Sequence, residues 1–412
     1  MNDLLQSRNI RGEIGLLPIK RVFLLLLIAL VTGCNYPGAL QAPTIDLVST
    51  AVAGTLAAEG ADPQASTTPA YAITLPRPVF FVSGSGGAAQ IWRLETDGTT
   101  QIQITDEPMT IDGYDISLID GSIAYVTDNQ LYLVDADGSN RRLMVDNAAA
   151  DPEAEDYFHR QRISDLRFSP DGRMLAYALN GVWILDLTTN QATQMLMNEL
   201  EETEEGIFPE AFYVPLLWAP DEERLLVTVG SSQGSSVSIL NVKAGQFVTD
   251  LESNDVLCCQ VSWTPDGSSV LVASPYIGII EPGLWRYDAD TGKRKTLAGF
   301  GDDGLFQFVG WPLQLTNDSL RYFYTSSTEI PAQDLPLFMM SSNLDGETNR
   351  VQLRPDSFSN IGEVLWAEDG SLALIVQLKP SGGTSGSVIL AYSDGRQLQN
   401  LLIEAQQLRW GP

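Results

Sequence analysis

From residue 78 to the end of the chain, short runs of alternating apolar and polar residues recur, separated by turn signals about every 8–12 residues. Alternation with a period of two is typical of half-buried strands. The strands follow one another without intervening helical patterns, which favours an all-β sandwich, barrel or propeller over βαβ units. The pattern therefore predicts an all-β domain.

A longer repeat narrows this choice. A strand that ends in an aromatic residue, followed by a Pro or Asp-Gly turn and a second apolar strand, returns at intervals of 44 to 55 residues. The aromatic residues are Phe168, Trp218, Trp263, Trp311, Trp366 and Trp410. Asp-Gly turns such as Asp97-Gly98 and Asp137-Gly138 join the third and fourth strands, because Gly accepts a positive φ. Units of this length with four strands predict the blades of a β-propeller.

The two ends of the repeat region complement each other. The last repeat, residues 404–412, is only a first strand, and the first unit, which starts at Val79, lacks that strand. Together they predict one composite blade, in which the C-terminal strand joins the first blade and closes the ring. Units near residues 78, 112, 160, 211, 256, 305 and 360 give about seven four-stranded blades. Six or eight remain possible, because unit two (Asp115–Gly121) lacks the aromatic residue and the Pro.

The N-terminal segment has the features of an export signal. Basic residues precede an apolar run from Val22 to Val31, which is about half the length needed to cross a bilayer. The sequence Val31-Thr32-Gly33-Cys34 resembles the bacterial lipobox. That resemblance implies that Cys34 becomes the acylated N-terminus of an exported protein, anchored to membrane lipid with its propeller on the extracytoplasmic side. An ordinary cleaved signal with a chance cysteine is the alternative.

The chain thus divides into three parts. Residues 1–33 form the signal peptide, and residues 34–77 form a flexible tether rich in Ala, Thr and Pro. Residues 78–412 form a single propeller domain. With 52 acidic and 24 basic residues the formal net charge is -28. Nucleic acid is excluded as a partner, because such binding depends on Lys and Arg.

Enzyme motifs are weak. The single histidine, His159, excludes mechanisms that need two, and we interpret it as a surface residue in an acidic connector. Residues 230–234 fit G-x-S-x-G, but strands on both sides predict a β-hairpin loop rather than a nucleophile elbow. The adjacent Cys258 and Cys259 are expected to lie in a buried strand, with a strained vicinal disulfide as the alternative. We expect no enzyme and no catalytic or cofactor-binding residues.

Acidic clusters also have simple explanations. Residues 135–140 and 288–292 bunch oxygen donors but lack the twelve-residue spacing of a calcium loop, so turn geometry explains them and no metal site is predicted. The acidic run Glu199–Gly206 is predicted to be a solvated linker between units three and four.

The repeat also resembles a known family. Phe168-Ser169-Pro170-Asp171-Gly172, followed by an apolar strand, is similar to the repeat of TolB-like and WD-repeat-like propellers of the bacterial envelope. The Gly-His and Trp-Asp pairs of eukaryotic WD repeats are absent. The resemblance implies a scaffold for protein contacts, sometimes attached to a hydrolase.

We therefore expect a non-enzymatic platform for a protein or peptide partner, with residues 146–159, 199–210 and 326–336 as candidate contact loops. The alternatives are a protein that binds a glycan or small molecule, or a propeller hydrolase, acting over the central channel, and a purely structural envelope protein.

Overall fold

The computed structural model describes residues 73–84, 87–203, 206–231, 234–251, 260–275, 281–301, 304–329 and 335–412. The predicted signal peptide, Cys34, most of the tether and the Cys258-Cys259 pair lie outside the described residues. No helix within the described ranges is long and apolar enough to cross a membrane.

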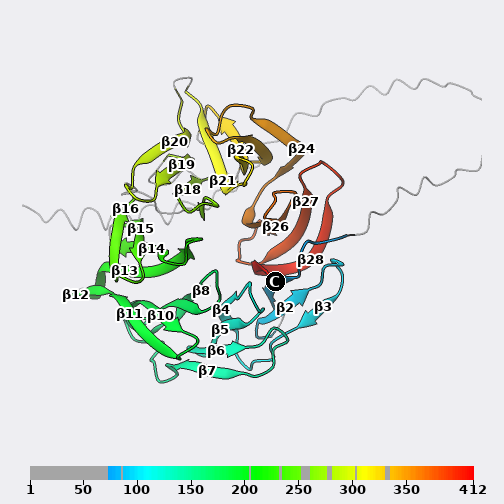
Figure 1. Ribbon diagram of the computed structural model, residues 1–412. Helices are drawn as coiled ribbons and strands as arrows, with labels where there is room; N and C mark the ends of the chain where they lie inside the picture. Colours follow the sequence, from blue (N-terminus) through cyan, green and yellow to red (C-terminus); the bar gives the residue numbers. More distant parts are fainter. Residues whose placement is uncertain are drawn as a thin grey trace, which may run out of the picture. The chain divides into compact units, whose positions relative to one another are not determined.

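The described strands form seven antiparallel blades around a common axis (Figure 1). The first blade contains β1 (Val79–Ser83), β2 (Gln90–Leu94) and β3 (Gln101–Gln103). The second contains β4 (Ile111–Ile116), β5 (Ile123–Thr127), β6 (Gln130–Val134) and β7 (Arg142–Asp146). The third contains β8 (Ser164–Phe168), β9 (Met174–Ala178), β10 (Gly181–Asp186) and β11 (Gln191–Met197). The fourth contains β13 (Gly206–Trp218), β14 (Arg224–Ser231), β15 (Gly234–Asn241) and β16 (Gln246–Asp250), and β12 (Glu199–Thr203) pairs with β13 as a fifth strand. The fifth blade contains β17 (Gln260–Trp263), β18 (Ser269–Ser274), β19 (Gly283–Asp288) and β20 (Arg294–Ala298). The sixth contains β21 (Phe306–Gln314), β22 (Ser319–Ser327), β23 (Leu337–Asn343) and β24 (Val351–Phe358). The seventh contains β25 (Ile361–Trp366), β26 (Leu372–Leu378), β27 (Gly386–Tyr392) and β28 (Gln399–Trp410).

Strand β28 closes the ring as the sequence predicted. Its first half pairs with β27, for example Val388 with Leu402, and its second half pairs with β1, with Val79 opposite Trp410. One long strand therefore serves as the outer strand of the seventh blade and the inner strand of the first. The prediction of a composite blade is confirmed, and the count of seven is confirmed with it.

The hydrophobic core is divided among the contacts between blades. Seven clusters of buried side chains each join two neighbouring blades, including one between the seventh and first blades that contains Val79, Leu374 and Leu408. Leu408 and Leu374 are fully buried in this cluster. Because every blade packs on both neighbours, the apolar faces of all seven sheets are covered.

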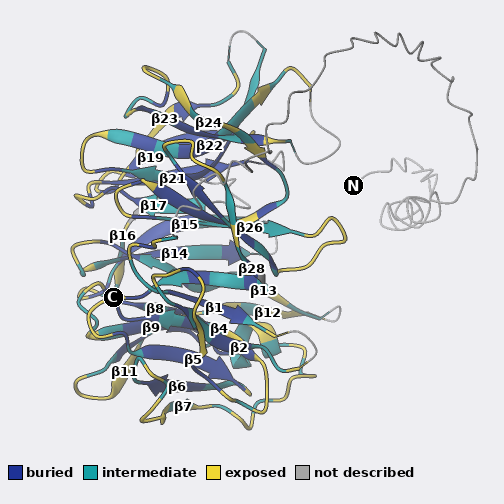
Figure 2. Ribbon diagram, turned by 90° about the vertical axis from the view of Figure 1, so that its right-hand side faces the viewer, coloured by how far each residue is buried: buried dark blue, intermediate teal, exposed yellow. Residues whose placement is uncertain are grey.

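The blades define two faces. The turn face carries the connections between first and second and between third and fourth strands, and the loop face carries the remaining connections, as Figure 2 shows from the side. The turns need glycine. Gly138 has a φ of +84°, and a Cβ atom there would lie 2.2 Å from the carbonyl oxygen of Ile104. The Asp-Gly pattern is therefore a requirement of blade packing.

One sequence prediction about this region is wrong. Residues 199–206 were expected to form a solvated linker, but Glu199–Thr203 pairs with the first half of β13 to form a hairpin. The apolar residues Leu200 and Ile207 lie among the acidic residues of this hairpin. The acidic side chains themselves are mostly exposed, which allows the backbone to pair while the charges stay in water.

Candidate functional site

The inner strands enclose a central channel with a cavity of about 720 Å³. Every blade contributes to its wall. The lining residues include Asp115, Arg167, Trp218, Gln260, Trp311, Glu363, Arg409 and Trp410. This volume lies within the range of small-molecule pockets, roughly 300–1,000 Å³. The channel is therefore a candidate site.

Indole N–H groups donate hydrogen bonds to backbone carbonyls on the channel-side edges of the inner strands. Each inner strand pairs along one edge only, so backbone groups on its other edge need partners from elsewhere. Four tryptophans donate Nε1–H to a carbonyl of the preceding blade: Trp218 to Arg167 (2.9 Å), Trp263 to Leu217 (3.2 Å), Trp366 to Trp311 (2.8 Å) and Trp410 to Trp366 (2.7 Å). The aromatic repeat of the sequence thus connects blade to blade.

Polar side chains in the channel accept hydrogen bonds from the same edges. Each acceptor receives a backbone N–H from the next blade: Asp115 Oδ2 from Phe168 (2.7 Å), Gln260 Oε1 from Trp311 (3.3 Å) and Glu363 Oε2 from Leu408 (3.0 Å). These carboxylates and this amide therefore have structural partners, and they hold neighbouring inner strands in register.

An ion triad spans the point where the ring closes. The guanidinium of Arg409 lies 3.4 Å from Asp115 on one side and 3.4 Å from Glu363 on the other. These three residues belong to the first, second and seventh blades. Their side chains are 30%, 13% and 27% exposed for Arg409, Asp115 and Glu363, so the triad is shielded but borders the channel. It joins three blades across the closure.

The channel environment shifts the pKa values of its charged groups. Burial raises the pKa of Glu363, although the charge of Arg409 opposes this shift. Burial alone would lower the pKa of Arg409, but the carboxylates of Asp115 and Glu363 outweigh it and the pKa is raised. Burial, and then the charge of Arg409, lower the pKa of Arg167, which donates to the carbonyls of Leu166 and Leu216. Arg409 thus remains a cation between two carboxyl groups.

These charged residues were not predicted as a site, although the sequence carries a signal for them. Arg167 and Arg409 each directly precede a repeated aromatic residue, and Glu363 lies three residues before one. In unit two, Ser117 donates its N–H to Ser122 as Ser169 does to Met174, so Ile116 takes the aromatic position and Asp115 precedes it. The repeat register therefore places all four residues toward the axis.

The residues that the sequence did single out serve the fold. His159 lies in the short π-helix η1 (Tyr157–Gln161), half-buried, with its ring 5.5 Å from that of Phe212. Asp137 accepts the N–H of Ser139, and Asp288 accepts that of Thr291. Among the described residues, no group of three or more His, Cys, Asp or Glu side chains is arranged to hold a metal ion.

The G-x-S-x-G segment is a hairpin as predicted. Strand β14 ends at Ser231 and pairs there with Gly234 at the start of β15. Residues 232 and 233 lie outside the described ranges. Strands therefore flank the motif on both sides, whereas a nucleophile elbow requires a strand followed by a helix.

Two acidic connectors come together on the loop face. We call residues 151–160, 197–203 and 206–210 the connector surface. Three contacts join its two parts: Glu155 Oε1 accepts the N–H of Ile207 (3.0 Å), Arg160 pairs with Glu202 (3.4 Å), and Asn198 Nδ2 donates to the carbonyl of His159 (2.5 Å). Three large apolar side chains on this surface are exposed, namely Phe158 (71%), Met197 (61%) and Phe208 (41%).

Comparison with known proteins supports the fold. The chain matches no protein-family model and no curated protein sequence. Among solved structures, an oligogalacturonate lyase in complex with manganese is 12% identical, with 79% of this chain and 84% of that chain covered and a TM-score of 0.50. An oligogalacturonate lyase from Vibrio parahaemolyticus is 11% identical, with the same coverage and a TM-score of 0.51. The fold is a β-propeller.

TolB from Acinetobacter baumannii is also among the similar structures. It is 16% identical, the match covers 81% of this chain and 82% of that chain, and the TM-score is 0.44. The β-propeller fold that this resemblance implied is confirmed by the blades themselves and by the two lyase structures. At 11–12% identity the two lyase structures show the fold and do not assign an activity to this chain.

Proposed function

We propose that the chain is an exported lipoprotein, anchored through acylated Cys34, whose propeller binds a protein or peptide partner through the connector surface. The observation that carries the proposal is the meeting of two acidic connectors, about 40 residues apart in the chain, on one face. Exposed apolar side chains such as Phe158 lie among carboxylates there.

The chemistry of this surface defines the partner. Aromatic side chains supply contact area that gains free energy when water is excluded. The surrounding acidic groups, including Glu153, Glu201 and Glu210, are exposed and attract cationic groups. The expected partner is a basic segment with apolar residues on one side, and the rigid blades beneath the connectors keep the surface in shape.

A second candidate is a small-molecule or glycan ligand in the central channel. The cavity volume of about 720 Å³ favours it. The engagement of Asp115 and Glu363 with backbone N–H groups and with Arg409 supports binding rather than catalysis at these carboxylates. This candidate becomes one outcome of the experiment below.

The experiment places a photocrosslinking amino acid at Phe158 in the full chain, expressed in its native membrane. We expect one covalent adduct, identified by mass spectrometry. Glu201→Lys/Glu210→Lys is expected to abolish the adduct by reversing two charges of the connector surface. Asp106→Lys/Glu281→Lys makes the same charge change at exposed positions outside that surface and is expected to retain it.

The anchor is tested in the same cells. A Cys34→Ala variant is expected to lose incorporation of a labelled fatty acid and to leave the membrane fraction. An adduct at Phe158 that is insensitive to Glu201→Lys/Glu210→Lys would contradict the role of the acidic groups. Absence of any adduct at Phe158, with an adduct from a crosslinker at Leu118 in the channel lining, would favour the channel candidate.

A further inference from the structure

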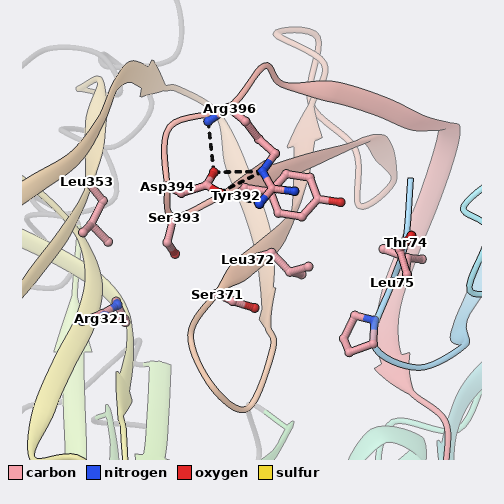
Figure 3. Close-up of a pocket in the computed structure, with 11 residues that line it drawn as sticks. Thr74, Leu75, Arg321, Leu353, Ser371, Leu372, Tyr392, Ser393, Asp394 and Arg396 are labelled. Atoms are coloured by element: carbon pink, nitrogen blue, oxygen red, sulfur yellow. Dashed lines mark hydrogen bonds and ion pairs between the residues drawn. The ribbon is translucent and has the colours of Figure 1, made fainter. Parts of the chain in front are cut away.

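A second pocket opens on the turn face, between the sixth and seventh blades (Figure 3). Its volume is about 470 Å³. Arg321 of β22 and Leu353 of β24 lie on one side, and Leu75 of the segment before β1 lies on the other, with Leu372 and Tyr392 of the seventh blade between them. The wall is therefore mostly apolar, with two guanidinium groups, those of Arg321 and Arg396.

Arg321 has an unusual environment in a chain with a net charge of -28. Its Nη1 donates to the carbonyl of Leu320 (3.1 Å) and to the hydroxyls of Ser319 and Ser341. Its Nε is buried and has no acceptor, and no carboxylate among the described residues pairs with it. Burial lowers the pKa of Arg321, and no neighbouring carboxylate opposes that shift.

The other arginine of the pocket is already neutralised. Arg396 forms an ion pair with Asp394, and its guanidinium lies 4.1 Å from the ring centre of Tyr392. Figure 3 shows this pair beside the pocket, away from Arg321. The pocket therefore carries one positive charge that no carboxylate offsets, on a half-buried guanidinium, and withdrawing a charge from water without a partner is costly.

We propose that this pocket binds a small monocarboxylate with an apolar body. Its carboxylate contacts Nη2 of Arg321, which makes no hydrogen bond to any described residue, whereas Nε is buried. Its body lies between Leu353 and Leu372. A dianion fits less well, because only one charge is uncompensated and Asp394 lies nearby. This site is separate from the connector surface, which lies on the opposite face.

The test is isothermal titration calorimetry of the full chain in non-ionic micelles, with titration into empty micelles subtracted. The probes are 3-phenylpropanoate and its neutral counterpart 3-phenylpropanamide. We expect the acid to bind roughly 10- to 100-fold more tightly than the amide, the range given by a hydrogen bond to a charged group. Arg321→Gln is expected to remove that preference, and Arg321→Lys to retain part of it.

Arg286→Gln is the matched control. Arg286 is also a partly buried arginine whose Nε has no acceptor, and its Nη2 donates to Gln314, but it does not line this pocket. The control is expected to bind both probes as the unchanged chain does. Equal affinity for acid and amide in the unchanged chain, no binding of the acid at concentrations on the order of 10 mM, or an equal loss in Arg286→Gln would each overturn the proposal.

Discussion

Replacing Arg409 by Met should destabilise the ring at its closure, and more strongly at higher pH. Met keeps an unbranched apolar stem like that of Arg but removes the cation between Asp115 and Glu363. Each carboxylate lies 3.4 Å from the guanidinium. At an effective dielectric constant near 20, each contact contributes an attraction of about 5 kcal/mol.

Desolvation offsets most of this attraction. Exposed pairs contribute about 0–1 kcal/mol net, whereas removing one partner of a buried pair costs about 3–5 kcal/mol. The three side chains are between 13% and 30% exposed, which is intermediate. We therefore expect Arg409→Met to lower the free energy of unfolding by about 2 kcal/mol at neutral pH.

The pH dependence follows from Glu363. Its pKa in the folded protein is raised above the ordinary value of 4.5, and loss of Arg409 raises it further. A carboxyl group with a raised pKa contributes full stability below its unfolded pKa and loses it as pH rises through the folded pKa. The loss caused by Arg409→Met should therefore be smaller at about pH 5 than at about pH 8.

Urea unfolding of the full chain at both pH values, followed by tryptophan fluorescence, measures the difference. The control is Glu363→Gln/Arg409→Met, which removes the unpaired carboxylate but keeps an amide oxygen for the N–H of Leu408. It should be more stable than Arg409→Met alone at pH 8. Equal losses at the two pH values, or a double variant no more stable than the single one, would show that Glu363 and Arg409 are not coupled in this way.

Two further predictions concern the turns and the indole contacts. Trp218→Phe should lower the free energy of unfolding by about 2 kcal/mol in the same urea assay, since it removes the hydrogen bond to Arg167 and leaves a small cavity; a change below about 0.5 kcal/mol would contradict this. Hydrogen bonds from Thr100 and Thr99 lower the pKa of Asp97 to about 2. Its contribution to the free energy of unfolding is therefore present above pH 3.8 and is lost as pH falls through about 2. Asp97→Asn should therefore unfold at a lower temperature than the unchanged chain at pH 5, and the gap should close toward pH 2; a constant gap would show that Asp97 does not titrate in this way.

The architecture could be predicted because its signal is repeated. Alternation gives the strands, and the repeated aromatic residues give the blade period. Four of these residues place an indole donor at the edge of the preceding inner strand. The composite blade also followed from the sequence, because an incomplete first unit and an incomplete last unit can satisfy each other's edges.

The ion triad and the connector surface were not predicted as units. Asp115, Glu363 and Arg409 are single polar residues in apolar strands, and only ring closure brings them within 3.4 Å. The hairpin at Glu199–Thr203 was missed because charge favoured a linker, whereas backbone pairing with β13 depends on where that strand starts. Such proximities depend on the three-dimensional arrangement of the blades and not on local propensity.

The shared strand β28 has a consequence for how the protein is made. Ser83 at the end of β1 donates to the carbonyl of Glu404, which lies 321 residues later in the chain. At a synthesis rate of about 5–20 residues per second, the first blade waits roughly 15 to 60 s for its inner strand. During that time β1 exposes an unpaired edge that can pair with other strands. Successful biogenesis therefore depends on protecting the earliest blade until the last strand has been made.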